Sequence, residues 1–465
     1  MSRTFLLMLI VALLGGCSLA PTYTRPEAPV PAAWPGAAGS GQQTAEPGEA
    51  ATDIPWKDFF VDEKLREVIS LALANNRDLR VAALNVERTQ AFYRIQRAEL
   101  LPTVDARGTF SKERVPGILS QSGQPATVEL YNVNLGVSSW EIDLFGRIRN
   151  LKDAALEQYL ATEQARASAQ MALVAAVANT WLTLAADREN LDLARSTLET
   201  QQETYEMIRR RAEVGASSDL DLRQAQTRVD AARVDIARYT SQVALDENAL
   251  ALLVGSPVPP ELLPEALADV TALRDFTPGL PSEVLQHRPD ILAAESQLKA
   301  AHANIGAARA ALFPRITLTT SIGTTSDQLS GLFTSGSGTW AFVPQIVVPI
   351  FDARSWAAYD VSKVDREIAV AQYEKAIQAA FREVADALAQ RGTLGDQLQA
   401  QQSLVEASTV GYRLSDARYT RGIDSYLRVL DAQRSLYGAQ QGLIAIRLAR
   451  LTNLVTLYKV LGGGA

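Results

Sequence analysis

The chain has few of the side chains that build enzyme and metal sites. Its 465 residues include one cysteine, Cys17, and two histidines, His287 and His302. A single cysteine excludes a disulfide framework and argues against a zinc site built on cysteines. The two histidines lie fifteen residues apart, a spacing that matches no metal motif, so we interpret both as structural residues.

Glycine-rich phosphate loops, nucleophile elbows and metal-ligand clusters are also missing from the sequence. The chain carries 45 basic and 52 acidic residues, a formal net charge of −7, so it lacks the basic surface typical of nucleic-acid-binding proteins. We therefore expect a protein that is not an enzyme, that has no cofactor or metal site, and that has no nucleic-acid partner.

The chain beyond residue 17 also lacks a run of 18 consecutive apolar residues. Its most apolar helical stretch, Leu173 to Ala186, is interrupted by Asn179 and two threonines. A helical membrane span needs about 20 predominantly apolar residues. We therefore interpret this stretch as a tightly packed helix interface and expect no helical membrane span.

The first 17 residues, MSRTFLLMLIVALLGGC, read as a targeting segment. Arg3 precedes a ten-residue apolar run, which is too short to span a bilayer as a mature helix. The ending Leu-Gly-Gly-Cys17 resembles the lipobox of bacterial lipoproteins, which predicts a signal peptide over 1–16 and lipidation at Cys17. An ordinary signal peptide that contains a cysteine is the alternative. In such lipoproteins Ser18, in place of an aspartate, fits delivery to the outer membrane.

The rest of the chain contains two copies of one unit. Residues 17–61 hold seven prolines and read as an extended tether. Matching residues then recur at offsets of 212, 206 and 207, which defines repeat 1 over 62–255, a connector over 256–283 and repeat 2 over 284–462. The duplication predicts that whatever structure one copy forms, the other forms again.

Each copy is expected to contain a helix, a β-hairpin, a very long helix and a returning helix. Pro102 and Pro314 end the first helices, and Gly215 and Gly422 end the long ones in the left-handed conformation that glycine tolerates best. The ranges are 63–101, 103–144, 147–214 and 219–254 in the first copy, and 284–313, 315–351, 353–420 and 426–461 in the second. Within the first hairpin, strands are expected near 103–111 and 131–144.

Helix lengths and strand number suggest how such units assemble. A 68-residue helix is roughly 100 Å long, and the two shorter helices of a copy stacked end to end reach a similar length. Four strands of membrane-spanning length cannot close a barrel, since the smallest barrels have about 8 strands. Three chains would supply twelve strands. Aromatic residues near the strand ends could form an interfacial girdle or ordinary core.

Four stretches carry a resemblance to a known family. The sequence RPEAPV at 25–30, NNRDLRVAALNV at 75–86, WEIDLFGR at 140–147 and YLRVLDAQR at 426–434 resemble those of TolC-like outer-membrane factors. The likeness is greatest to the OprM-type lipoproteins of resistance-nodulation-division efflux pumps. It implies a mainly α homotrimer with a 12-stranded β-barrel in the outer membrane, continuous with a long periplasmic α-helical barrel. It also implies a periplasmic adaptor and an inner-membrane transporter as partners.

The resemblance further implies a periplasmic gate and two docking tips. Leu427 and Asp431 match gate positions, and they share one helix face because they are four residues apart. Residues that match positions tying neighbouring helices together are Asp221, Tyr419 and Arg434. The adaptor-docking tips correspond to Gly215, Ser217, Ser218 and Asp219, and to Gly422, Ile423, Asp424 and Ser425.

Three other functions compete with this interpretation. A periplasmic adaptor lipoprotein would need a lipoyl-like domain and a single helical hairpin, and a tethered enzyme would need a catalytic motif. The third is the same duct serving a metal-efflux or type I secretion machine, against which four methionines and two histidines argue weakly. An outer-membrane exit duct that passes drugs and other small molecules fits the sequence best.

Overall fold

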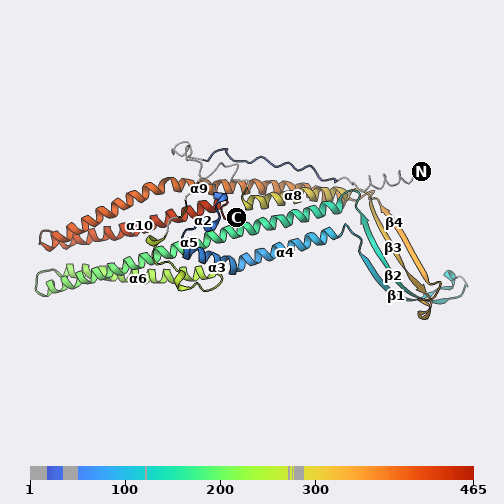
Figure 1. Cartoon of the computed structure of the whole chain (residues 1–465), viewed down its shortest axis with the longest axis horizontal. Coiled ribbons are helices and arrows are strands. Elements are labelled where there is room, and N and C mark those ends of the chain that lie inside the picture. The colour runs from blue at the N-terminus through green and yellow to red at the C-terminus, as the bar shows by residue number, and fades with distance from the viewer. Residues whose placement is uncertain are drawn as a thin grey trace. The chain divides into compact units, whose positions relative to one another are not determined.

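A computed structural model describes residues 18–34, 51–120, 123–270, 273–274, 276 and 287–464 (Figure 1). Cys17 and the signal peptide predicted over 1–16 lie outside the described residues. The chain forms two compact units. Unit 1 contains described residues 18–27, Asn85–Thr162 and Ala293–Tyr373, and unit 2 contains the remainder.

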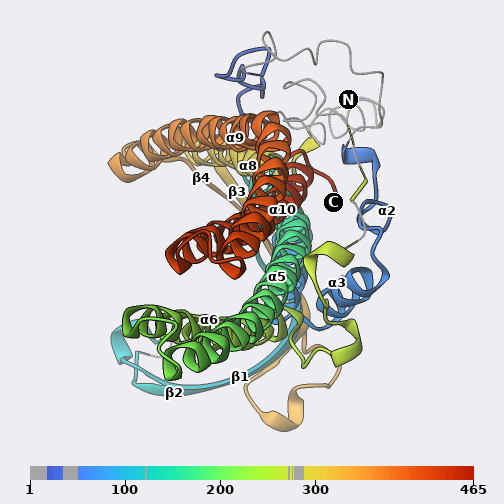
Figure 2. The same cartoon turned by 90° about the vertical axis from the view of Figure 1, so that its left-hand side faces the viewer.

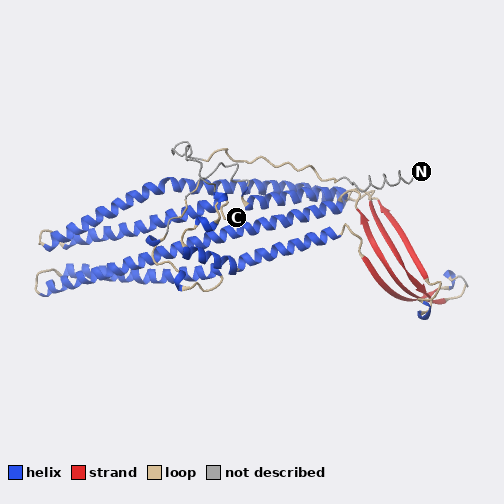
Figure 3. Cartoon of the chain, in the orientation of Figure 1, coloured by secondary structure: helices blue, strands red, loops and turns tan. Residues whose placement is uncertain are grey.

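Unit 1 is built on one four-stranded antiparallel sheet, drawn in red in Figure 3. Its strands are β1 (Val104–Val115), β2 (Ala126–Ile142), β3 (Arg315–Ser326) and β4 (Gly338–Val347), in the spatial order β1-β2-β3-β4. The expected hairpins are therefore present, and β2 pairs with β3 to join the two repeats in one sheet. The strands β1 and β4 each keep one edge that pairs with no described strand.

The first hairpin runs further toward its loop than the sequence suggested. Strands were expected near 103–111 and 131–144, but the ladder continues to the pair Val115 and Ala126. Lys112 and Glu129 face each other in this extension and form an ion pair. Charged residues interrupt the apolar alternation, yet backbone pairing and opposite charges extend the ladder regardless.

Helices α5 (Arg147–Glu213) and α9 (Ala353–Thr420) start in unit 1 and extend into unit 2. Within unit 2, the returning helices α6 (Asp219–Val254) and α10 (Tyr426–Val460) lie beside them (Figure 2). The unit also contains α2 (Trp56–Phe59) and α3 (Glu63–Asn75), and helices α4 (Arg77–Ala98) and α8 (Pro289–Ala310) cross from one unit to the other.

The core of unit 2 contains the apolar stretch of α5. Trp181 is buried and donates a hydrogen bond of 3.0 Å from Nε1 to the carbonyl of Leu262. Nearby, Phe59 stacks on Tyr458 with ring centroids 4.0 Å apart. Among the described helices, α5 alone has a stretch apolar and long enough to cross a membrane, but most of that stretch is buried within the chain. The structure thus agrees with a packed interface, as expected for Leu173 to Ala186.

The single helix expected over 63–101 is wrong, because Asn76 divides it into α3 and α4. The Asn76 backbone is extended, and its Oδ1 accepts a hydrogen bond of 2.8 Å from the Leu79 amide, which begins α4. Its Nδ2 donates a 2.8 Å bond to the carbonyl of Leu253 at the end of α6. Asn76 therefore interrupts the helix in order to satisfy both α4 and α6.

Repeat 2 has a corresponding junction at Arg288, which is 212 residues beyond Asn76. The Arg288 guanidinium donates a 2.8 Å bond to the carbonyl of Val460, the last residue of α10. It also pairs with Asp290 and Glu383, at 2.7 and 2.9 Å. Both copies thus place a polar side chain where the returning helix ends, which supports the interpretation of one rod assembled from two helices.

The N-terminal segment is attached to unit 1 by a buried carboxylate. Glu295 on α8 accepts hydrogen bonds from Tyr23 Oη at 3.0 Å and from Arg25 Nη2 at 2.6 Å. Lys299 Nζ lies 3.3 Å from the same carboxylate, and together these cations hold the pKa of Glu295 below its usual value in spite of burial. His302 packs edge-on against Tyr23, in keeping with a structural role.

Candidate functional site

The first tip joins α5 to α6 through a tight polar turn. Gly215 has a φ of 75°, its amide bonds to Ala212, and the Ala216 amide bonds to the carbonyl of Arg211. This pattern is the Schellman motif, in which a left-handed residue lets the last helical carbonyls find donors. The local sequence alone explains this helix end, because an L side chain at that φ is strained.

The start of α6 is closed by a capping box. Ser218 Oγ accepts a 3.1 Å bond from the Asp221 amide, and the Asp221 carboxylate accepts from the Ser218 amide and hydroxyl. Ser217 donates to the same carboxylate at 3.3 Å. Ser218 is thus the N-cap of α6, and the bonds of Asp221 stay within its own tip.

The second tip repeats the motif between α9 and α10. Gly422 has a φ of 74°, and the amides of Gly422 and Ile423 bond to the carbonyls of Tyr419 and Arg418. Ser425 is the N-cap of α10 but makes no capping bond with its side chain. Asp424 pairs instead with Arg418, which lowers the pKa of this carboxyl.

Behind the tips, an apolar cluster joins helices α5, α6, α9 and α10 of unit 2. Tyr426, Val429 and Leu430 on α10 pack with Ile208 on α5 and Ala225 on α6. Tyr419 on α9 adds an aromatic contact to Tyr426, with centroids 5.4 Å apart, and the Arg211 guanidinium lies 5.2 Å from the Tyr419 ring centroid. The sequence analysis singled out Tyr419 but missed its partners. The 3 and 4 spacing of 426, 429, 430 and 433 was the available signal.

Leu427 and Asp431 lie on α10 outside that cluster. Leu427 is 53% exposed, and the Asp431 side chain is 58% exposed. Asp431 Oδ1 lies 3.6 Å from Arg434 Nη2, so Arg434 pairs with the candidate gate acid on its own helix. The two gate candidates therefore share one face, and the packing of this chain leaves that face open.

A pair of hydrogen bonds between the returning helices was missed by the sequence analysis. Tyr437 Oη on α10 donates a 3.0 Å bond to Asp235 Oδ2 on α6. One turn further, Gln441 Nε2 donates a 3.0 Å bond to Tyr239 Oη. These links hold α10 against α6 just beyond the helical turns that carry the gate candidates.

Large apolar side chains are exposed on the single sheet of unit 1. Trp340 and Phe342 are exposed on β4, Ile322 on β3, and Leu135 on β2. Phe110 and Tyr131 pack together across β1 and β2 with centroids 4.7 Å apart. In this sheet, exposed apolar side chains occur together with two outer edges that no described strand pairs. This combination is typical of strands that face lipid in a larger barrel.

No group of three His, Cys, Asp or Glu residues is placed to hold a metal ion in the part of the chain that the structure describes. The outer membrane efflux protein family model matches residues 68–256 and 280–463. The chain belongs to the outer membrane efflux protein family. The two matched ranges are the two repeats of helix, hairpin and paired helices.

Curated outer membrane efflux proteins resemble the chain over nearly its full length. The toluene efflux pump outer membrane protein TtgC of Pseudomonas putida is 51% identical over 467 residues, covering 100% of this chain and 96% of the relative. The outer membrane protein OprJ of Pseudomonas aeruginosa is 43% identical, covering 98% and 95%.

Solved structures show the same fold. The open state of the MtrE outer membrane channel of Neisseria gonorrhoeae has a TM-score of 0.87 at 39% identity and covers 96% of this chain and 98% of its own. A membrane protein from Pseudomonas aeruginosa has a TM-score of 0.91 at 42% identity, with the same coverage. This outer membrane efflux protein is therefore an outer-membrane channel with a β part and a long α-helical part that extends into the periplasm.

Proposed function

We propose that the channel is the trimeric exit duct of a tripartite pump of the resistance-nodulation-division type. Three copies would close one barrel from twelve strands, because β1 and β4 each retain an edge that no described strand pairs, and open edges are not tolerated in lipid. These unpaired edges are the observation that carries the proposal. The inner-membrane transporter and a periplasmic adaptor would be its partners.

The tips are the proposed adaptor-docking surface. Val214, Leu220 and Ile423 are apolar and exposed beside Gly215 and Gly422. A Cβ added to either glycine would meet nothing within 4 Å, so the turns are open to a partner. Exposed apolar groups at the rim of polar turns favour protein contact.

The proposed resting gate is formed by Leu427 and Asp431. In a trimer, three copies of each residue would lie around the threefold axis, one from the exposed face of each α10. Three leucines would block hydrated solutes, and three carboxylates would attract cations. Three further residues are proposed to influence opening. Asp221 would act through the first tip, Tyr419 through its contact with Tyr426, and Arg434 through its pair with Asp431.

The proposed cargo consists of antibiotics and aromatic solvents. Relatives about 50% identical over nearly the whole chain are named as toluene, solvent and antibiotic efflux pump proteins. Metal efflux and type I secretion remain alternatives from the sequence, but no feature of the described residues favours them.

Two measurements test the proposal. Deleting the gene should lower the inhibitory concentrations of antibiotics and toluene, and the wild-type chain should restore them. The mass of the purified protein in detergent should be three times that of the mature chain, which is predicted to start at Cys17. A stable monomer inserted in bilayers would refute the trimeric assembly. Unchanged susceptibility after deletion, in a strain without a second exit duct, would refute the cargo.

A further inference from the structure

A cavity of about 350 Å³ lies in unit 1 where the strands meet the helices. Residues from the end of β2, the start of α5, the start of β3 and the start of α9 line it, including Glu141, Arg147, Arg315, Asp352 and Arg354. Three guanidinium groups and several carboxylates thus surround the cavity. Which of these charged groups pair with each other determines what the cavity can bind.

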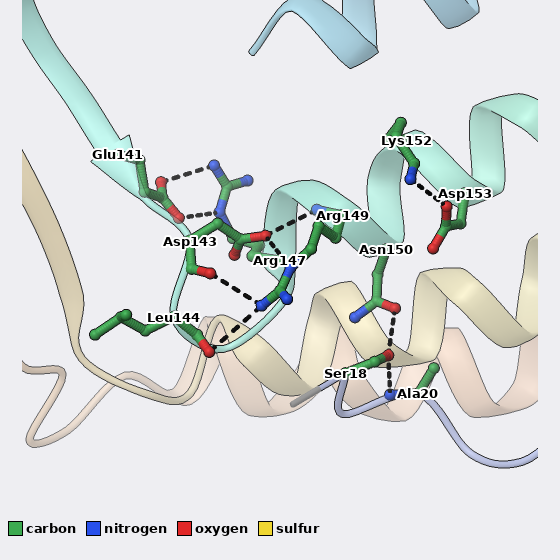
Figure 4. A network of polar contacts seen from close by, with 10 residues as sticks. All are labelled: Ser18, Ala20, Glu141, Asp143, Leu144, Arg147, Arg149, Asn150, Lys152 and Asp153. Atoms are coloured by element: carbon green, nitrogen blue, oxygen red, sulfur yellow. Dashed lines mark hydrogen bonds and ion pairs between the residues drawn. The ribbon is translucent and has the colours of Figure 1, made fainter. Parts of the chain in front are cut away.

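Two carboxylates at this cavity, those of Glu141 and Asp143, are already satisfied (Figure 4). Glu141 accepts two bonds from Arg147, at 2.9 and 2.8 Å. Asp143 accepts from the backbone and side chain of Arg149, at 2.9 and 3.2 Å. Each acid is therefore neutralised by an arginine of the first turn of α5, and the cavity does not need a cation.

The remaining acid, Asp352, caps α9. Its Oδ2 accepts a 2.6 Å bond from Ser355 Oγ, and its Oδ1 accepts from the Arg354 amide at 3.1 Å. These bonds lower the pKa of the Asp352 carboxyl. Because the carboxylate is directed to the backbone and to Ser355, it is not paired with the Arg354 guanidinium.

Two guanidinium groups keep free donors. Arg315 is 54% exposed, and its one ion pair, from Nε to Glu141 Oε2, is long at 3.3 Å. Arg354 is exposed, and its guanidinium forms no ion pair with a residue of the described ranges. Free guanidinium N–H groups bind phosphate oxygens in pairs, so this side of the cavity suits a phosphate group.

An exposed apolar surface adjoins these arginines. Ile350 and Phe351, between β4 and α9, are 90% and 92% exposed. Val347 at the end of β4 and Trp356 in the first turn of α9 are also exposed. Donors for phosphate next to bare apolar side chains fit an amphiphile better than a soluble anion.

The chain segment after Cys17 is held at the same place. Ser18 Oγ donates a 2.8 Å bond to Asn150 Oδ1, in the helical turn that also contains Arg147 and Arg149 (Figure 4). Ala20 packs so closely that a Cβ at Gly306 would meet its Cα at 2.8 Å. A lipid attached to Cys17 would therefore enter the membrane beside this cavity.

We propose that this cavity binds the phosphate headgroup of an anionic membrane phospholipid, with Arg315 and Arg354 as donors. The acyl chains would run along Ile350 and Phe351. The inference relies on the proposed function only for the trimer and on the lipidation predicted at Cys17 for the anchor, and the binding site itself consists of residues of one chain.

The test is native mass spectrometry of the full-length protein in detergent with added phosphatidylglycerol. Diacylglycerol with the same acyl chains is the probe without a phosphate. The double variant Arg315→Gln and Arg354→Gln should bind phosphatidylglycerol at least about tenfold more weakly, since two charge-assisted contacts are lost. Diacylglycerol binding should not change.

The matched control is Arg195→Gln with Arg233→Gln, two exposed helix arginines that pair only with neighbouring aspartates. It should bind phosphatidylglycerol like the wild type. A second variant, Arg315→Lys with Arg354→Lys, keeps both charges and should retain part of the affinity, which separates binding from folding defects.

Equal phosphatidylglycerol binding by the glutamine variant and the wild type would overturn the proposal. Displacement of the lipid by millimolar inorganic phosphate would instead show a site for a soluble anion, and would also overturn it. The same spectra report the oligomer. Monomers would count against the trimer, whereas lipid preference is read on whichever oligomer is present.

Discussion

The carboxyl group of Asp187 on α5 lies near the carboxyl group of Asp246 on α6, and the nearby acid disfavours the ionised form of Asp187. Asp246 is buried, and Gln242 Nε2 donates to its Oδ1 at 3.3 Å. Burial and the neighbouring acid raise the pKa of Asp187 to about 7, although Arg238 acts in the opposite direction. The adjacent Arg188 is paired with Glu247 at 2.6 Å and is therefore already engaged. The proximity of two acids between these helices therefore disfavours ionisation of Asp187.

Stability should therefore fall as the pH rises through the pKa of this pair. The folded-state pKa is raised from 3.8, so the contribution is complete below about pH 4 and lost by about pH 7. Asp187→Asn keeps a neutral donor and should stabilise the protein at pH 8 by about 1–2 kcal/mol, discounted for partial exposure. Thermal unfolding at pH 5 and pH 8 measures this. Asp192→Asn, at an exposed position on α5, is the control. If the unfolding temperature depends on pH in the same way for the wild type, Asp187→Asn and Asp192→Asn, the prediction is contradicted.

Replacing both gate candidates should open the resting channel. Leu427→Ala with Asp431→Ala removes bulk and charge from the exposed face of α10 and should raise single-channel conductance severalfold in planar bilayers. Asp431→Ala alone should reduce block by multivalent cations. Alanine is the best helix former, so α10 is preserved. Asp386→Ala, an exposed acid on α9, is the control. Unchanged conductance with intact trimers would move the gate toward Tyr419 or Asp221.

Bulky residues at the tip glycines should abolish efflux while trimers still assemble. Gly215→Trp and Gly422→Trp project into open space, so the folding cost is backbone strain of about 1–3 kcal/mol at these left-handed positions. Drug susceptibility and trimer content in membranes are the two measurements. Asparagine tolerates the left-handed region and is the matched control at both sites. Full efflux by the tryptophan variants would exclude the tips as the docking surface.

Lipidation at Cys17 should be visible in the mature protein. Mass spectrometry of the N-terminal peptide should show a diacylated Cys17 as the first residue, and Cys17→Ser should lose the acyl mass. Each buried CH₂ contributes about 0.8 kcal/mol to anchoring, so the variant should extract more readily from membranes even if its barrel inserts. A free Cys17 thiol in the mature chain would refute the lipobox.

The bond between Tyr437 and Asp235 should stabilise the pairing of α10 with α6. Tyr437→Phe removes the donor, while Asp235 keeps its 3.0 Å pair with Arg238, so the cost should be about 1 kcal/mol. Thermal unfolding of the purified protein measures it. Tyr93→Phe, whose hydroxyl bonds to no described residue, is the control, and an equal cost for both variants would rule out a contribution from the bond.

Much of the candidate site was predictable because its determinants are local. Gly215 and Gly422 end their helices through bonds to residues three and five positions earlier, and Ser218 caps α6 within one turn. Which face of α10 is open was not predictable from spacing alone. It depends on Tyr426 and Leu430 packing against α5 and α6, contacts between residues about 200 positions apart in the chain.

The sequence by itself determined the duplicated units, the two long helices and their glycine ends, since periodicity and capping act within a few residues. Only the tertiary structure decided that Asn76 breaks a helix to reach Leu253 and that Arg25 pairs with Glu295, 270 residues away. Likewise, only the folded chain joins β2 to β3. Local propensity depends on neighbouring residues in the sequence, so it gives no information about a distant partner. Once folding buries a polar side chain, that side chain must form hydrogen bonds with such a partner.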